Sequence, residues 1–84
     1  MNYALSKHAK KVLAEREIQL EWLERTLREP VLRRPDPDDS SLERRYWWAI
    51  PEFEGRVLRV VVNVAIEPVR VVSVFFDRSM RGKL

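Results

Sequence analysis

Three residues have side chains that could take part in catalysis and stand out from the sequence around them. They are His8, Arg59 and Ser73. A histidine exchanges its proton near neutral pH, so His8 is a candidate general acid or base. An arginine stabilises a pentavalent phosphate while a hydroxyl group hydrogen-bonds a phosphate oxygen, and Arg59 and Ser73 are predicted to form such an oxyanion clamp together. RNA cleavage at this clamp needs no metal, because the 2′-hydroxyl of RNA is an internal nucleophile.

Each of the three residues also has a purely structural explanation. His8 is the only histidine, so no second histidine supports a metal site or a two-histidine mechanism, and it is equally a surface residue without a role. Arg59 and Ser73 interrupt apolar β patterns, and an antiparallel sheet often keeps one wet, polar face. Spacing alone leaves the catalytic and the structural explanations open.

A second group of residues is suited to binding nucleic acid. The segment Arg44-Arg45-Tyr46-Trp47-Trp48 mixes cations with aromatic rings, as a surface that stacks bases and neutralises phosphates requires. A core strand has much the same composition, and for Trp48 we expect core packing rather than base stacking. The candidate RNA-binding side chains in this group are Lys10, Lys11, Tyr46 and Arg70.

The composition disfavours several classes of enzyme. With 84 residues the chain is too short for a two-domain enzyme, and we expect one domain over 1–84. There is no cysteine, which excludes a disulfide, a cysteine-based zinc site and a thiol nucleophile. The HExxH motif, the glycine-rich phosphate loop and the GxSxG elbow are missing from the sequence, so metal hydrolases, P-loop nucleotidases and serine hydrolases are disfavoured. We expect neither a metal nor a cofactor.

The charge pattern favours an anionic partner such as RNA. The chain has 16 basic and 13 acidic residues, a net charge of +3. Its most apolar stretch, 57–76, includes Arg59, Asn63 and Glu67 and therefore cannot cross a bilayer as a helix. The N-terminus lacks the apolar block of a signal peptide. We expect a cytoplasmic protein without a membrane partner.

The elements that must position these residues change in type along the chain. Up to Pro30 the sequence has no glycine and is rich in Leu, Glu, Lys and Arg, which favours helices. We predict a helix over 7–15 that is capped by Ser6 and a second helix over 20–28. A break over 16–19 separates them, and Pro30 ends the helical part.

The rest of the chain is dense in Val, Phe, Trp and Tyr, which favours strands. We predict strands over 31–33, 43–50, 57–66 and 69–77, a turn over 51–55 and a basic, frayed tail over 78–84. The order predicts an α+β fold in which two N-terminal helices precede a three- or four-stranded antiparallel sheet. The helices are expected to pack across one face and to leave the other face free for a functional surface.

Alternation along the two best strands predicts which side chains share a face. In 57–66 the residues that point one way are Leu58, Val60, Val62, Val64 and Ile66. In 69–77 the residues Val72, Val74 and Phe76 are expected to lie opposite Val71, Ser73, Phe75 and Asp77.

Five short motifs occur in an order that resembles a known family. They are Ser6-Lys7-His8-Ala9, Glu15-Arg16-Glu17-Ile18, Leu27-Arg28-Glu29-Pro30, Leu58-Arg59-Val60-Val61-Val62 and Val71-Val72-Ser73-Val74-Phe75. The series resembles the small bacterial domain of unknown function 4258 and covers most of the chain. It places the chain among the RelE-like and BrnT-like toxins, whose fold of helices followed by an antiparallel sheet agrees with the expectation above.

The resemblance implies a metal-independent endoribonuclease, the toxin of a type II toxin–antitoxin pair. Such a toxin is neutralised by a small antitoxin protein, with which it forms an oligomer. In this family His8 would be the general acid or base, Arg59 would hold the scissile phosphate, and Ser73 would supply the hydroxyl of a usual threonine. Arg16 would position His8 or bind the RNA.

The chain departs from the family pattern at two informative positions. Glu17 replaces a usual glycine in the break between the helices, and Phe75 replaces a tyrosine that would have offered a phenol. Two other hypotheses remain beside the toxin. One is a non-catalytic protein-interaction module, and the other is an RNA- or DNA-binding regulator that uses the cations of the first helix and the tail.

Overall fold

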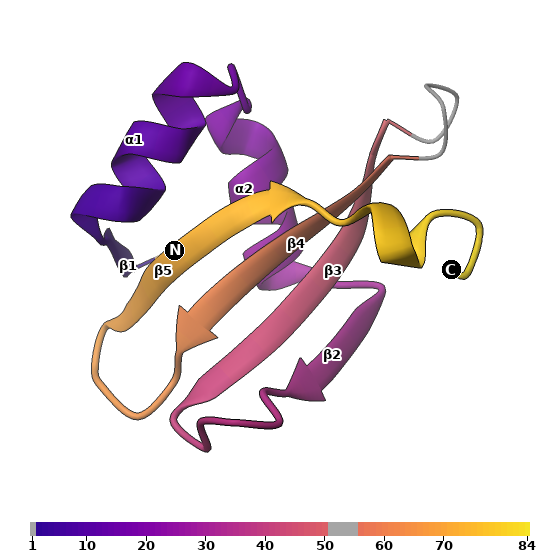
Figure 1. Ribbon diagram of the computed structural model, residues 1–84. Coiled ribbons are helices and arrows are strands. Elements are labelled where there is room, and N and C mark those ends of the chain that lie inside the picture. The colour runs from indigo at the N-terminus through magenta and orange to yellow at the C-terminus, as the bar shows by residue number, and fades with distance from the viewer. Residues whose placement is uncertain (1, 51–55) are drawn as a thin grey trace.

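The chain forms a mixed β-sheet with two helices packed on one face, as the computed structural model shows for residues 2–50 and 56–84 (Figure 1). The elements, in chain order, are β1 (Tyr3–Leu5), α1 (Lys7–Glu15), α2 (Leu20–Arg28), β2 (Leu32–Pro35), β3 (Leu42–Ile50), β4 (Arg56–Asn63), β5 (Val69–Phe76) and the 3₁₀ turn η1 (Arg78–Met80). The predicted turn over 51–55 lies outside the described residues. Over the two described ranges, no helix has the length and apolar character needed to span a membrane.

The sheet differs from the antiparallel sheet of three or four strands that the sequence predicts. Five strands lie in the order β1-β5-β4-β3-β2, and β1 runs parallel to β5. The predicted fold class is therefore wrong in the number of strands and in their direction, although both helices do precede the four longer strands. β1 has three residues, too few to show an alternating pattern, and it is defined by its pairing with β5 rather than by local propensity.

The two helices begin and end where the sequence predicts. The Ser6 hydroxyl accepts a hydrogen bond from the Ala9 N–H (3.0 Å) and caps α1, as expected. The same hydroxyl donates to the carbonyl of Val72 (3.0 Å), and the Ser6 N–H donates to the carbonyl of Val71 (2.9 Å). Ser6 therefore both caps the helix and ties its first turn to β5.

The break between the helices is a Schellman motif with Glu17 in the left-handed region. Glu17 has a φ of 52°. The Ile18 N–H donates to the carbonyl of Leu13 (3.0 Å), and the Glu17 N–H donates to the carbonyl of Ala14 (3.4 Å). The left-handed conformation costs a residue with a Cβ roughly 1–2 kcal/mol, which gives a physical reason for a glycine at this position.

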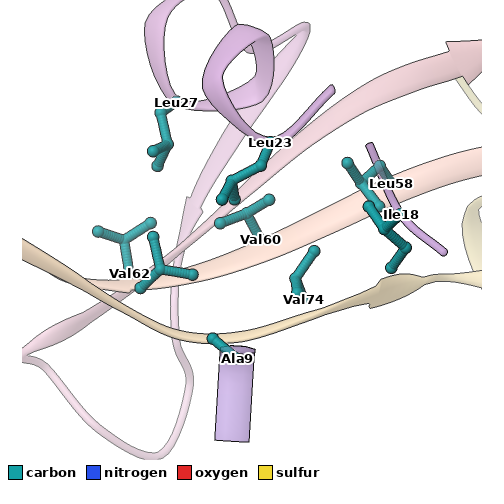
Figure 2. Close-up of a cluster of buried hydrophobic side chains, with 9 residues drawn as sticks. Ala9, Ile18, Leu23, Leu27, Leu58, Val60, Val62 and Val74 are labelled. Atoms are coloured by element: carbon teal, nitrogen blue, oxygen red, sulfur yellow. The ribbon is translucent and has the colours of Figure 1, made fainter. Parts of the chain in front are cut away.

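The core lies between the helices and the sheet (Figure 2). Leu23 of α2 lies over Val60 of β4 in Figure 2, and both side chains are fully buried. The buried cluster consists of Ala9, Ile18, Leu23, Leu27, Leu58, Val60, Val62, Val71 and Val74. α1 packs on β5 and α2 packs on β3 and β4, so burial of the apolar helix faces fixes both helices over the sheet.

β4 is shorter than the predicted strand. It ends at Asn63, and Val64 and Ile66 are 40% and 42% exposed instead of continuing the core face. The Asn63 side chain accepts a hydrogen bond from the Ala65 N–H (3.0 Å), a local turn contact that competes with the strand. The predicted placement of Val64 and Ile66 beside Val62 is therefore wrong.

β5 contains a bulge that breaks the predicted alternation. The adjacent β4 residues Val61 and Val62 pair with Ser73 and Val71, which leaves Val72 as an extra residue. Val71 is consequently fully buried in the core cluster, although strict alternation assigned it to the opposite face. The bulge also places the carbonyl of Val72 where the Ser6 hydroxyl binds it.

The two tryptophans of β3 point in opposite directions. Trp47 is the register partner of Leu58 and packs against the core cluster, and the Arg25 guanidinium carbon lies 5.4 Å from its ring centroid. Trp48, the next residue, points to the other face of the sheet and is half-buried there. The prediction of core packing for Trp48 is therefore wrong, and Trp47 takes that place.

The C-terminal segment 78–84 is folded rather than frayed. The Asp77 carboxylate caps η1 by accepting hydrogen bonds from the N–H (2.9 Å) and the hydroxyl (2.5 Å) of Ser79. A further turn follows, in which the Lys83 N–H donates to the carbonyl of Met80 (3.0 Å). These contacts hold a basic segment against the start of β4, where the Asp77 N–H donates to the carbonyl of Val57 (2.8 Å).

Candidate functional site

His8 and Ser73 line one cavity between α1 and the end of β5, which we call the first cavity. Its volume is about 810 Å³, within the usual range for ligand sites. The lining residues are His8, Val12, Arg16, Ile18, Arg56, Val57, Ser73, Val74, Phe75, Phe76, Asp77, Arg78 and Arg81. Two of the three predicted catalytic residues therefore meet in one place, together with Arg16.

One wall of the first cavity is a row of α1 side chains. His8 and Val12 are four residues apart and so lie on one face of α1, and Arg16, the C-cap residue, lines the cavity directly after the helix. Ser6 fixes the start of this helix to the backbone of β5 directly before Ser73. His8 is exposed, so a ligand in the cavity can reach its imidazole ring.

The facing wall comes from β4, β5 and the C-terminal segment. Arg78 and Arg81 reach the first cavity from the folded segment that follows β5. Arg56, at the start of β4, lies with its guanidinium carbon 5.1 Å from the ring centroid of Phe76. Arginine guanidinium groups match the oxygen geometry of phosphates. The arginines on both walls therefore make the cavity a candidate phosphate site.

The sequence prediction missed Arg56, Arg78 and Arg81 as site residues. The pattern of Asp77 followed two residues later by Ser79 is a helix N-cap signal and indicates a folded turn at the place where a frayed tail was expected. Arg56 has no such local signal, because only the pairing of β4 with its neighbours brings it to the cavity.

The charge of the first cavity is strongly positive. Its walls hold four arginines and His8, and the one acidic side chain on them within the described ranges is Asp77. Asp77 is 7% exposed, and its carboxylate is bound by Arg59 and Ser79. Since this carboxylate is already compensated, the side chains of Arg16, Arg78 and Arg81 present a positive field to an anion.

Arg59 lies outside the first cavity. By register it faces Phe75, which makes it a diagonal neighbour of Ser73 on the same face of the sheet. Its guanidinium carbon lies 4.3 Å from the Phe75 ring centroid, and Nη1 donates to Asp77 Oδ2 (3.1 Å), on the side away from Ser73. Arg59 Nε is buried and has no hydrogen-bond partner among the described residues. The structure thus pairs Arg59 with Asp77 and does not place it in one cavity with Ser73, and their joint clamp stays a prediction.

A second cavity lies between the C-terminal segment and the face of the sheet that the helices leave free. Its volume is about 500 Å³, and it contains both Arg59 and the predicted RNA-binding residue Tyr46. The lining residues are Leu32, Arg34, Arg44, Tyr46, Arg59, Asp77, Ser79, Met80, Lys83 and Leu84. Asp77 is shared by the two cavities, so they meet at the start of the C-terminal segment.

Two groups at this second cavity or next to it have shifted pKa values. Burial alone lowers the pKa of Arg44, but hydrogen bonds to Tyr46 and Asp36 outweigh burial and raise the pKa above its ordinary value. The hydrogen bond from the Asp38 N–H is the main reason that the pKa of Asp36 lies below its usual range, and Arg44, 3.3 Å away, adds to this. Arg44 is therefore held in place by a partly neutralising partner.

The remaining predicted RNA-binding residues lie elsewhere. Lys10, Lys11 and Arg70 line neither cavity. Lys11 Nζ lies 3.8 Å from Glu15 Oε1, one helical turn away, and Lys10 is exposed on the same helix. Arg70 is exposed where β5 pairs with β1. Their contribution to RNA binding stays a prediction.

Comparison with known proteins identifies a family. A family model described as a domain of unknown function, number 4258, matches residues 5–76. Neither a curated protein nor a solved structure matches the chain. The matched range includes His8 and Ser73 but ends before Arg78 and Arg81, so it spans all of the first cavity except the wall that follows β5. In the part of the chain that the structure describes, no three His, Cys, Asp or Glu side chains gather as a metal site requires.

Proposed function

The chain belongs to the family of domain of unknown function 4258, and from its first cavity we propose that it is a metal-independent endoribonuclease. The observation that carries the proposal is that the only histidine of the chain shares one cavity with four arginines and a serine hydroxyl. Arginines bind phosphates, and a histidine moves protons near neutral pH. RNA is a suitable substrate for a phosphate-binding arginine and a proton-transferring histidine, because its phosphodiester lies next to an internal nucleophile, the 2′-hydroxyl.

In the proposed reaction His8 is the general base. The imidazole accepts the proton of the 2′-hydroxyl, and the 2′-oxygen forms a bond to the adjacent phosphorus. The bond between phosphorus and the 5′-oxygen then breaks, and the imidazolium returns the proton to that oxygen. The products are a 2′,3′-cyclic phosphate and a free 5′-hydroxyl, and no metal or cofactor takes part.

The arginines of the facing walls stabilise the pentavalent phosphate. Arg16 approaches from the wall of α1 and Arg78 and Arg81 from the C-terminal wall, so a phosphate between them meets cations on two sides. Ser73, on β5, donates its hydroxyl to a phosphate oxygen. In this proposal Arg59 is a positioning residue, because it holds the carboxylate of Asp77 from which the C-terminal wall starts.

We infer the biological setting from the resemblance to RelE-like and BrnT-like toxins. The protein acts on cellular RNA in the cytoplasm as the toxin of a toxin–antitoxin pair, and a small antitoxin protein is its partner. The exposed position of His8 and the positive charge around it support this setting, since both an RNA and an acidic inhibitor are attracted to such a cavity.

The test is an RNA cleavage assay with purified protein in the presence of EDTA. Wild-type protein is expected to cut single-stranded RNA and to leave 2′,3′-cyclic phosphate ends, while RNA with 2′-deoxy sugars stays intact. His8→Gln is expected to lower the rate at least about 100-fold, the usual contribution of general acid–base catalysis. Lys7→Gln, an exposed neighbour that lines neither cavity, is the matched control and keeps the wild-type rate.

Expression in a bacterial host extends the assay to the toxin setting. Wild-type protein should arrest growth and fragment total RNA, whereas His8→Gln at equal protein level should do neither. If folded wild-type protein leaves RNA intact, the nuclease proposal is wrong. Cleavage that survives His8→Gln shows that the base is another group. RNA binding without cleavage favours the RNA-binding regulator instead.

A further inference from the structure

The second cavity holds none of the groups that contact RNA in the proposed reaction, yet four cations line it. Arg34, Arg44 and Lys83 stand on its walls beside Arg59. Arg59 is bound to Asp77, and Arg44 is paired with Asp36. Arg34 and Lys83 are exposed and have no ion-pair partner within the described ranges. This cavity therefore holds two uncompensated cations that can bind an anion.

The cavity also has an apolar side. Leu32 from β2 and Met80 and Leu84 from the C-terminal segment line it. Tyr46 is 3% exposed, so its ring supports the base of the cavity and cannot serve as a stacking platform. Apolar surface next to free cations suits a ligand with a flat, weakly hydrated part and a phosphate, which describes a nucleotide.

The C-terminal segment connects the two cavities. Hydrogen bonds from the Arg81 N–H to the carbonyl of Arg78 (3.3 Å) and from the Lys83 N–H to the carbonyl of Met80 (3.0 Å) fold it into successive three-residue turns. The first bond ends the 3₁₀ turn η1, and the second closes a type II β-turn in which Arg81 is extended and Gly82 has a φ of 77°. Arg78 and Arg81 line the first cavity, and Met80 and Lys83 line the second. Figure 1 shows this segment continuing from the end of β5 past β4.

We propose that the second cavity binds a nucleotide that flanks the cleaved link, so that the substrate is single-stranded RNA long enough to occupy both cavities. The proposal rests on the proposed function for the identity of the ligand. A single strand can bend around segment 78–84 and place an unpaired base against Leu32, whereas the bases of a duplex are held in pairs. Arg34 and Lys83 bind the phosphate of this flanking nucleotide.

The test uses RNA that the protein binds but cannot cut. Uridine oligomers with 2′-O-methyl groups lack the nucleophile, so equilibrium binding is measured without cleavage. An octamer reaches both cavities, and a dimer occupies the first cavity alone. The variants are Arg34→Ala and Lys83→Ala, and the matched control is Arg28→Ala, also an exposed arginine, which lines neither cavity.

Arg34→Ala and Lys83→Ala are each expected to weaken octamer binding about ten-fold, the effect of one hydrogen bond to a charged group. Each should also lower the slope of log K against log salt by about 0.7, the value for one phosphate contact with a single strand. Dimer binding should not change, and Arg28→Ala should alter neither oligomer. Circular dichroism and the denaturation midpoint establish that each variant is folded.

The outcomes separate this inference from the proposed function. Unchanged octamer affinity in both variants overturns the second site, even when the wild-type protein cuts RNA. Octamer binding no tighter than dimer binding also overturns it. If the variants weaken octamer binding as expected while unmodified RNA is never cut, the second site stands as part of a binding surface and the nuclease proposal fails.

Discussion

Leu58 and Arg59 are neighbours on β4 and point to opposite faces of the sheet. Leu58 is fully buried among apolar side chains beneath the helices. Arg59 is 20% exposed on the other face, where it is bound to Asp77 and lies over Phe75. The covered face is closed mainly by apolar area, and Arg45 Nη1 donates there to the carbonyl of Leu27 (2.9 Å). On the other face directed polar contacts accompany buried apolar side chains such as Val57.

The difference shows how a chain of 84 residues combines stability with a charged site. Apolar packing on the covered face does not depend on the direction of any one contact, so it stabilises the sheet without placing charges. On the other face the pair of Arg59 and Asp77 fixes the start of the C-terminal segment, and this segment supplies cations to both cavities. We expect substitutions on the two faces to differ accordingly.

The largest expected effect is on the covered face. Leu58→Ala removes a fully buried side chain and leaves a cavity in the core, so the free energy of unfolding should fall by about 3 kcal/mol. Leu20→Ala is the matched control, because Leu20 is 50% exposed and its loss should change stability by less than about 0.5 kcal/mol. Urea denaturation measures both. Equal losses would show that the covered face is not the main source of stability.

The next effect concerns the polar face. Arg59→Ala leaves the carboxylate of Asp77 without its cation and should cost about 2 kcal/mol, less than a fully buried pair because Arg59 is partly exposed. A double-mutant cycle with Asp77→Ala should give a coupling energy of about 1–2 kcal/mol. Arg28→Ala, at an exposed arginine, is the control. If the effects of Arg59→Ala and Asp77→Ala on the free energy of unfolding are strictly additive, the two side chains do not stabilise each other. That result would contradict the conclusion that directed polar contacts stabilise this face.

The smallest effect tests the elbow between the helices, next to the first cavity. Glu17→Gly relieves the left-handed strain, and the greater freedom of glycine in the unfolded chain offsets part of the gain, so stability should rise by about 0.5–1 kcal/mol. Glu17→Val, with a branched Cβ at the same φ, should lower stability. Thermal unfolding measures both variants. A destabilising glycine would show that the Glu17 side chain makes a compensating contact.

Part of the fold follows from local signals. The bounds of both helices and the Ser6 cap could be predicted, because helical periodicity and capping depend on residues within one or two turns. β1 could not, since it is stabilised by pairing with β5, more than sixty residues away along the chain. The bulge at Val72 could not be predicted either, because a prediction from alternating side chains assumes an unbroken strand register.

The candidate site divides in the same way. His8 and Ser73 could be selected from residue type and from the pattern they interrupt. Their meeting in one cavity depends on Ser6, whose hydroxyl joins the start of α1 to the backbone of β5. The position of Arg59 could not be foreseen, because its guanidinium has a choice of neighbours on the sheet and binds Asp77 instead of facing Ser73.

The sequence by itself determined the helices, the apolar face of β4 and the positive net charge, since each of these depends on residue type and short-range periodicity. The tertiary structure alone decided which charged side chains share a cavity. His8, Arg56 and Arg81 come from the start, the middle and the end of the chain. Only β-sheet pairing and the cap at Asp77 bring them together, and no local pattern encodes contacts over such separations.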